Sequence, residues 1–302
     1  MMAQKDRDIS ASLIVDRSMT QLEIASFFVI VLVLSSAAVS LRGFPEPGVG
    51  QSAGMAWFQG AAFLIAFIPM LGAIACAALF RGRRGLNLLW LRTKKLRINY
   101  NLYVFSFFSV VFVNIIHGVI ISLWMGTPFL HGSPGELLAG FSISFAILLV
   151  LVIGEELGWR GYAQPGLQAY VTPFTTSLII GVIWGVWHYL VFWGYYVAIT
   201  GNEIYGWIGV SEMTILPILF SFVFTWMFNK CHGAMITALI LHAANNAATG
   251  VFVNHQILED ARGLDFFVVS HGSALPFLII VVFLIARDRE MFFRRVGDDA
   301  DC

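Results

Sequence analysis

The chain has 302 residues, of which 58% are hydrophobic and only 12% are charged, and its formal net charge is zero. Soluble domains carry about 25% charged residues, and several apolar stretches here approach the roughly 18 residues that suffice to span a bilayer. Composition therefore excludes an ordinary soluble enzyme and predicts a single membrane domain over residues 1–302.

Long apolar stretches separated by short polar ones predict an all-α, polytopic membrane helix bundle of about eight transmembrane helices. In chain order, the expected spans are 22–41, 55–80, 101–124, 137–153, 174–199, 213–229, 233–253 and 266–286. Two connections, 200–212 and 254–273, are expected to be loops. We interpret their acidic residues as solvated loop charges: Glu203, Glu212, Asp260 and Asp265.

Lysine and arginine segregate when the connections are assigned alternately to the two sides of the membrane. One side holds Lys5, Arg7 and Arg17, seven basic residues from Arg81 to Arg97, then Arg160, Lys230 and the four arginines after residue 286. The other side holds only Arg42 and Arg262. Because basic connections stay in the cytoplasm, both termini are expected there, and in a bacterium the membrane would be the plasma membrane.

Three ionisable groups, Glu155, Glu156 and Arg160, lie where the expected span 137–153 leaves the bilayer. On a continuing helix, Glu156 and Arg160 are four residues apart and share a face, whereas Glu155 lies about 100° away around the axis. We therefore expect Glu156 to pair with Arg160 while Glu155 stays free to take a proton. The alternative is an interfacial ion pair that only ends the span.

Two later spans carry histidines. His188 follows Trp184 by one helical turn, and His242 shares a face with Asn246, with Asn245 close by. Strongly polar side chains inside a span are costly and are candidates for function. An imidazole and an amide could form a metal site or a pair of hydrogen-bond donors. Each could equally be a polar contact between helices.

A carboxylate, two histidines and an amide on three separate spans are together the groups needed to hydrolyse an amide. The base activates water and the donors stabilise the oxyanion. The sequence has no HExxH zinc helix, no GxSxG elbow and no GxGD aspartate motif inside a span. Asn114 and His117 form a similar polar pair, for which we favour packing or a water contact. The basic segment 81–97 indicates topology, and we expect no nucleic-acid partner.

The ordered motifs EExxxR (Glu155–Arg160), aromatic-xxx-His (Trp184–His188) and HxxxN (His242–Asn246) resemble those of the CPBP intramembrane proteases. This family includes the type II, Rce1-like CAAX prenyl proteases and the bacterial Abi or bacteriocin-immunity proteins. The resemblance covers about residues 137–250, which we expect to be the catalytic core. It implies a helical bundle and a glutamate-based endopeptidase whose site opens toward the cytosol.

Carried over by position, the resemblance implies that Glu155 activates water and that Glu156 and Arg160 support it. It also implies that three further residues line the site: His188, His242 and Asn246. Trp184 stands where the family more usually has phenylalanine. Because family members are often labelled metalloproteases, His188 and His242 could hold Zn²⁺. We favour a metal-free site in which His242 and Asn246 donate to the oxyanion.

The expected function is an intramembrane endopeptidase acting on a membrane-associated or lipidated peptide, with membrane lipid around it. Two alternatives stay open. One is a non-enzymatic immunity or peptide-binding protein that uses the same residues as a polar pocket. The other is a proton-coupled transporter, although we find neither an inverted repeat nor paired broken helices.

Overall fold

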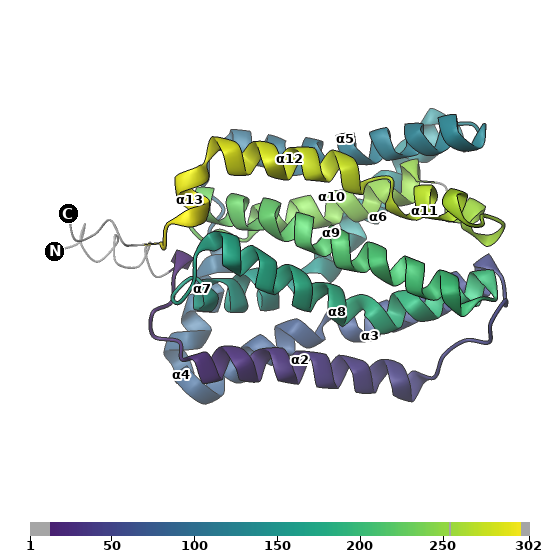
Figure 1. Ribbon diagram of the computed structural model, residues 1–302. Helices are drawn as coiled ribbons and strands as arrows, with labels where there is room; N and C mark the ends of the chain where they lie inside the picture. The colour runs from purple at the N-terminus through teal and green to yellow at the C-terminus, as the bar shows by residue number, and fades with distance from the viewer. Residues whose placement is uncertain (1–12, 254, 297–302) are drawn as a thin grey trace.

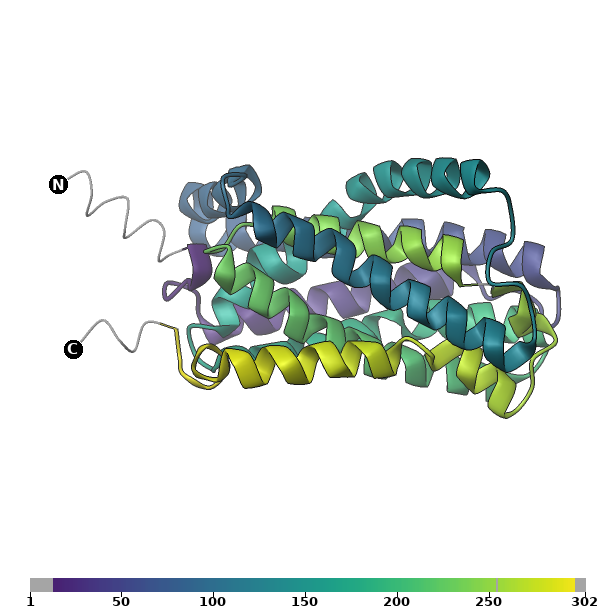
Figure 2. The ribbon, with the colours of Figure 1, turned by 90° about the horizontal axis from the view of Figure 1, so that it is seen from above.

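The computed structural model describes residues 13–253 and 255–296, and all regular structure in these ranges is helical. The long helices run side by side as one elongated bundle (Figures 1 and 2). The elements are α2 (Gln21–Arg42), α3 (Gln51–Ala66), α4 (Ile68–Lys94), α5 (Tyr100–Met125), α6 (Pro134–Gly158), the π-helical η1 (Trp159–Ala163), α7 (Gln164–Leu167), α8 (Pro173–Thr200), α9 (Glu203–Lys230), α10 (Ile236–Phe252), the 3₁₀ turn η2 (His255–Glu259), α11 (Leu264–His271), α12 (Ala274–Arg287) and α13 (Arg289–Phe293).

The outer faces of the bundle are apolar, as expected where lipid surrounds a protein. Among the described residues, six helical segments are long and apolar enough to cross a membrane, or seven if the bent pair α11–α12 counts as one span. The expected class, a polytopic helix bundle, is confirmed. The count of eight is not, because α10, which we expected as a span, has only 17 residues and falls short by length.

Several long helices begin at sequence signals for a helix start. Thr20 and Glu23 form a reciprocal capping box at the start of α2, and Ser133 and Glu136 form another at α6. Thr172 caps α8, and a proline follows at the first helical position of both α6 and α8. Because these caps satisfy backbone N–H groups that the first turn leaves without partners, they fix where each helix begins.

Helices α8 and α9 form a hairpin in the centre of the bundle, and the sequence prediction for α9 is wrong at its start. The helix begins at Glu203, so the expected loop 200–212 is largely helical. Glu212 is buried rather than solvated and accepts a hydrogen bond of 2.6 Å from the hydroxyl of Tyr196 on α8. The second expected loop, 254–273, likewise contains α11, where Asp265 accepts a hydrogen bond from Trp124.

The basic segments of the sequence meet at one end of the bundle. There Lys95 donates to the carbonyl of His232 at 2.9 Å, and Lys230 pairs with Asp288 at 2.6 Å. At the opposite end, Gly48 N–H donates to the carbonyl of Val197. Lys5 and Arg7, which also contributed to the predicted charge bias, lie outside the described residues. Which end faces the cytoplasm stays a prediction.

Helix α4 changes direction at Gly82, whose φ of 54° and ψ of −139° are not helical. Glycine lacks a Cβ and adopts a positive φ without steric cost. The part of α4 after Gly82 lies across the end of the bundle (Figures 1 and 2), and it buries Leu88, Leu89 and Arg92. The bend therefore places a buried arginine next to the end of α6.

Candidate active site

The candidate site lies at the end of α6, where two glycines allow an unusually close helix contact. A Cβ on Gly154 would meet the carbonyl oxygen of Ala66 at 2.4 Å, and one on Gly158 would meet Cβ of Pro69 at 2.5 Å. Small residues four apart let helix backbones approach closely in membranes. Glu155 and Glu156 lie between these glycines, so the packing of α6 on the α3–α4 junction fixes the backbone that carries both carboxylates.

After Gly158 the helix widens into η1, in which Gln164 N–H donates to the carbonyl of Trp159 five residues earlier. Such π turns are rare and frequently occur at functional sites. Proline at position 165 explains this one. Its ring would collide with the carbonyl of Gly161 four residues earlier in a regular α-helix. All five residues of η1, including Arg160, are buried.

Glu156 is the centre of a buried ionic triad with Arg160 and His242. Its carboxylate oxygens lie 3.4 Å from Nε of Arg160 and 2.9 Å from Nδ1 of His242. The exposed fraction is 0% for Glu156 and Arg160 and 6% for His242. The pairing of Glu156 with Arg160 was predicted from spacing, whereas the bond to His242 was not. Because the carboxylate accepts at Nδ1, that nitrogen carries a proton, and Nε2 is left for other partners.

Glu155 has a different environment from its neighbour. It is half-buried, and its carboxylate accepts a hydrogen bond of 2.9 Å from Nε1 of Trp184. The Trp184 ring packs edge-on to the ring of His242 at 5.4 Å between centroids. Trp184 therefore joins the half-buried carboxylate to the buried triad. Of two adjacent glutamates, Glu156 is fully buried between two ionic partners and Glu155 is only half-buried.

His188 joins the group through Trp184. Its Nδ1 lies 2.9 Å from the carbonyl of Trp184, which fixes Nδ1 as a donor and leaves Nε2 available. The rings of Trp184 and His188 are 5.7 Å apart. The structure thus brings five of the predicted residues together: Glu155, Glu156, Arg160, His188 and His242.

Asn246 lies one turn after His242 on an exposed part of α10. Its amide oxygen accepts a hydrogen bond from Asn245, whose own oxygen accepts from Asn114 at 2.9 Å. Among the described residues, no hydrogen bond or ion pair joins Asn246 to the other five. The Asn114 contact with Asn245 escaped the sequence analysis, although the polar pair in α5 was its signal. His117 contacts the carbonyl of Val269 at 3.1 Å, as packing would require.

The side chains of the site offer few ligands to a metal ion. In the described part of the chain, no group of three or more His, Cys, Asp or Glu side chains is placed to hold a metal ion. Nδ1 of His188 and Nδ1 of His242 are each occupied by a hydrogen-bond acceptor. Such a bond is also usual for a histidine that binds a metal through its other nitrogen, so Nε2 of each could be a ligand. A zinc site in a hydrolase normally uses three protein ligands, and the described residues supply no third one beside these two.

Comparison with known proteins gives two matches. Residues 136–248 match the family model described as "Type II CAAX prenyl endopeptidase Rce1-like". Over 199 residues the chain is 30% identical to a protein named CAAX prenyl protease 2 from Methanococcus maripaludis. That match covers 62% of this chain and 68% of the archaeal protein. The family-model match contains the glutamates and histidines described above.

Proposed function

This chain belongs to the Rce1-like family of type II CAAX prenyl endopeptidases, membrane-embedded proteases, and we propose that Glu155 is the base with which it hydrolyses a peptide bond. The substrate in this proposal is a membrane-associated or lipidated peptide. A CAAX prenyl protease is what the archaeal relative is named, so a prenylated C-terminus is the first substrate to try.

One observation carries the assignment of the base. Glu155 is half-buried and is oriented by Trp184, whereas Glu156 is fully buried and held by Arg160 and His242. A general base must reach the proton that it removes. Glu156 lacks that access, so in this proposal its role is to hold His242 in place.

The reaction would proceed in two steps. The carboxylate of Glu155 takes a proton from water while the water oxygen bonds to the carbonyl carbon of the peptide. His242 Nε2, in the doubly protonated imidazole, and the exposed amide of Asn246 then donate to the oxyanion. When the C–N bond breaks, Glu155 returns its proton to the leaving amine. His188 lines the same site, and no step uses a metal.

The test is cleavage by purified protein in liposomes, with matched prenylated and unprenylated peptides. Because a general base contributes about 10²–10⁴-fold, Glu155→Gln should lower kcat by that factor while thermal unfolding stays unchanged. Glu136→Gln is the control, since Glu136 is exposed at the far end of α6. Full activity of Glu155→Gln would exclude this base.

If only the wild type cleaves, the products also show which peptide class, prenylated or unprenylated, is the substrate. If the wild type cleaves neither peptide set in several lipid mixtures, the proposal fails, and a peptide-binding or immunity role becomes the better account of the same residues.

Treatment of the purified protein with a chelator tests whether cleavage requires a metal ion. We expect full activity in metal-stripped protein, and a loss that added Zn²⁺ restores would contradict the metal-free mechanism.

A further inference from the structure

The π turn after the glutamates leaves a backbone carbonyl that needs a partner. In an α-helix, the carbonyl of Gly161 would accept from the N–H of residue 165. That residue is Pro165, which has no N–H. A buried carbonyl without a hydrogen bond is costly, so another group is expected to supply the donor.

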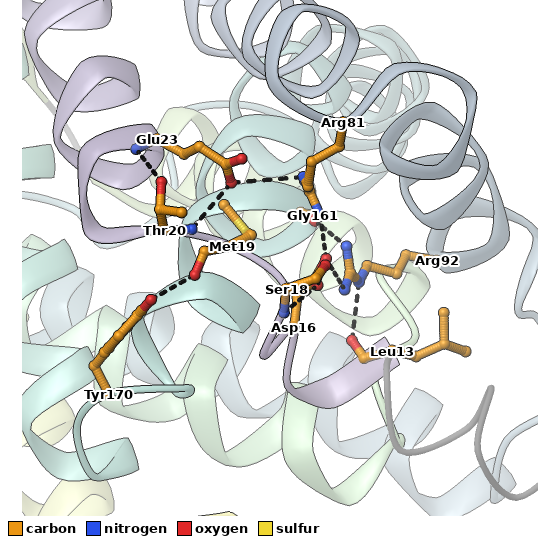
Figure 3. A network of polar contacts seen from close by, with 10 residues as sticks. All are labelled: Leu13, Asp16, Ser18, Met19, Thr20, Glu23, Arg81, Arg92, Gly161 and Tyr170. Carbon is orange, nitrogen blue, oxygen red and sulfur yellow. Dashed lines mark hydrogen bonds and ion pairs between the residues drawn. The ribbon is translucent and has the colours of Figure 1, made fainter.

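Arg92 supplies it from the part of α4 that follows the bend. Its Nη1 donates to the carbonyl of Gly161 at 2.8 Å, and its Nε donates to the carbonyl of Leu13 at 2.9 Å. Figure 3 shows the guanidinium between these two carbonyls, with the carboxylate of Asp16 4.0 Å from Nη2. Arg92 is 0% exposed.

The N-terminal segment holds the other side of the same turn. The N–H of Asp16 donates to the carbonyl of Pro165 at 2.9 Å. The Asp16 side chain forms an ion pair with Arg81, which in turn lies 3.7 Å from Glu23 (Figure 3). Both residues that define the π turn, Gly161 and Pro165, are thus held by groups distant in sequence.

Arg92 also contacts the helix that carries His242. Its backbone carbonyl accepts a hydrogen bond of 3.3 Å from the N–H of Met235, the residue that precedes α10. The side chain of Arg92 therefore holds η1, and its backbone holds the start of α10. Glu156, one turn before η1, and His242, on α10, are the two residues that must meet at 2.9 Å.

We propose that Arg92 is a positioning residue for catalysis, which fixes the distance between the Glu156–Arg160 pair and His242 by bracing η1 and α10 together. This inference rests on the proposed protease function. Arg92 is fully buried, and its side chain donates to two backbone carbonyls. Its effect reaches the reaction through the placement of His242, which should alter turnover more than substrate binding.

The experiment compares Arg92→Gln, Arg92→Lys and a matched control, Glu23→Gln. Glu23 belongs to the same buried network, but among the described residues its carboxylate pairs with Arg81 and accepts from the N–H of Thr20, and it makes no bond to η1. We expect Arg92→Gln to lower kcat by up to about 100-fold with KM unchanged, since a misplacement of about 1 Å caused far from the chemistry can cost that much. Lysine cannot serve both carbonyls with fixed geometry, so Arg92→Lys should recover only part of the activity.

Glu23→Gln should lower thermal stability without lowering kcat. If Glu23→Gln lowers kcat as much as Arg92→Gln does, the effect is general destabilisation and the inference is overturned. Unchanged kcat in Arg92→Gln also overturns it. If Arg92→Gln does not fold, the kcat of Arg92→Lys is compared with that of Glu23→Gln, and the same criteria apply.

A second measurement separates this inference from the proposed function. Hydrogen exchange of the backbone in 158–168 and 236–246 should accelerate in both Arg92 variants and stay at the wild-type rate in Glu23→Gln. Unchanged exchange in the Arg92 variants overturns the inference, whether or not the protein cleaves peptides. Absence of Glu155-dependent cleavage in the wild type overturns the proposed function instead.

Discussion

At the scale of single residues, two adjacent glutamates differ because a helix separates neighbours by about 100°. Glu156 faces Arg160 and His242 in the interior, while Glu155 faces Trp184 and keeps some exposure. Consecutive carboxylates of one type can thus take different roles, one structural and one chemical, since the environment decides which oxygen can reach a substrate.

The indole N–H of Trp184 should matter for turnover. Trp184→Phe keeps an aromatic ring beside His242 but removes the donor to Glu155. That hydrogen bond orients the base, and because a misplacement of about 1 Å can cost about 100-fold, we expect kcat to fall by about ten-fold. Steady-state kinetics in liposomes would measure it.

Trp187→Phe is the matched control for that change. Its indole N–H donates to Ser35 at 2.7 Å and not to the candidate site, although it lies on the same helix. We expect kcat of Trp187→Phe to match the wild type. An equal loss of kcat in the two variants would indicate damaged packing of α8 and would contradict a role of the Trp184 N–H in turnover.

Sequence spacing alone could predict the contact of Glu156 with Arg160, because both residues lie on one helix. It could not predict the bond from His242 to Glu156, since 86 residues separate them and only the packing of α10 on α6 brings them together. Asn246 shows that residues on one helix face need not bond to the same partners. It shares a face with His242, yet its bonded partner is Asn245.

At the scale of helices, the α8–α9 hairpin depends on two glycines of α8, which have no side chain and therefore let the backbone of α9 approach closely. A Cβ on Gly185 would lie 2.3 Å from the carbonyl oxygen of Met213, and one on Gly181 would lie 2.6 Å from Cα of Ile218. The four-residue spacing places both glycines on one face. Trp184 and His188 are carried by the same helix, so this contact also sets their position.

Gly185→Ala should therefore destabilise the protein. Overpacking costs about 1–3 kcal/mol, and here the contact atom is backbone, which cannot rotate away. Thermal unfolding in detergent, followed by tryptophan fluorescence, would measure the change. Gly140→Ala on α6 has open space around its Cβ and should be neutral or slightly stabilising. Equal melting temperatures for the two variants would contradict this account.

The helix boundaries were predictable where caps and turns mark them, as at Thr20, Ser133 and Thr172. The start of α9 was not, because the polar segment 200–212 was expected to be a loop and its Glu203 and Glu212 were interpreted as solvated charges. Glu212 is buried on the hairpin because Tyr196 donates to it. A single sequence does not show which distant side chain will satisfy a buried carboxylate, so hydropathy alone placed this boundary too late.

At the scale of the whole molecule, charge distinguishes the two ends of the bundle. The end that holds Lys95, Lys230 and Asp288 also holds the η1 turn, through Arg92. Because basic residues favour the cytoplasmic side, we predict that this end faces the cytoplasm. The candidate site would then receive its water from that side.

Cysteine labelling in intact cells tests this orientation, in a background where Cys76, Cys231 and Cys302 are replaced. Arg84→Cys and Glu46→Cys are both exposed positions, on opposite ends of the bundle. A membrane-impermeant maleimide should label Glu46→Cys in intact cells and Arg84→Cys only after permeabilisation. The opposite pattern would invert the predicted topology.

The π turn at Trp159–Ala163 has a consequence for how this protein tolerates insertions and deletions. A π turn accommodates one residue more than an α turn, so it acts as a one-residue insertion within a continuous helix. Upstream, the helix must direct Glu155 and Glu156 toward Trp184 and His242. Downstream, it must direct Gln168 toward Asn229. Deleting one residue from 159–163 would therefore restore an α turn and leave both registers in place, but the ring of Pro165 would then collide with the carbonyl four residues before it. The deletion should be tolerated only together with replacement of Pro165.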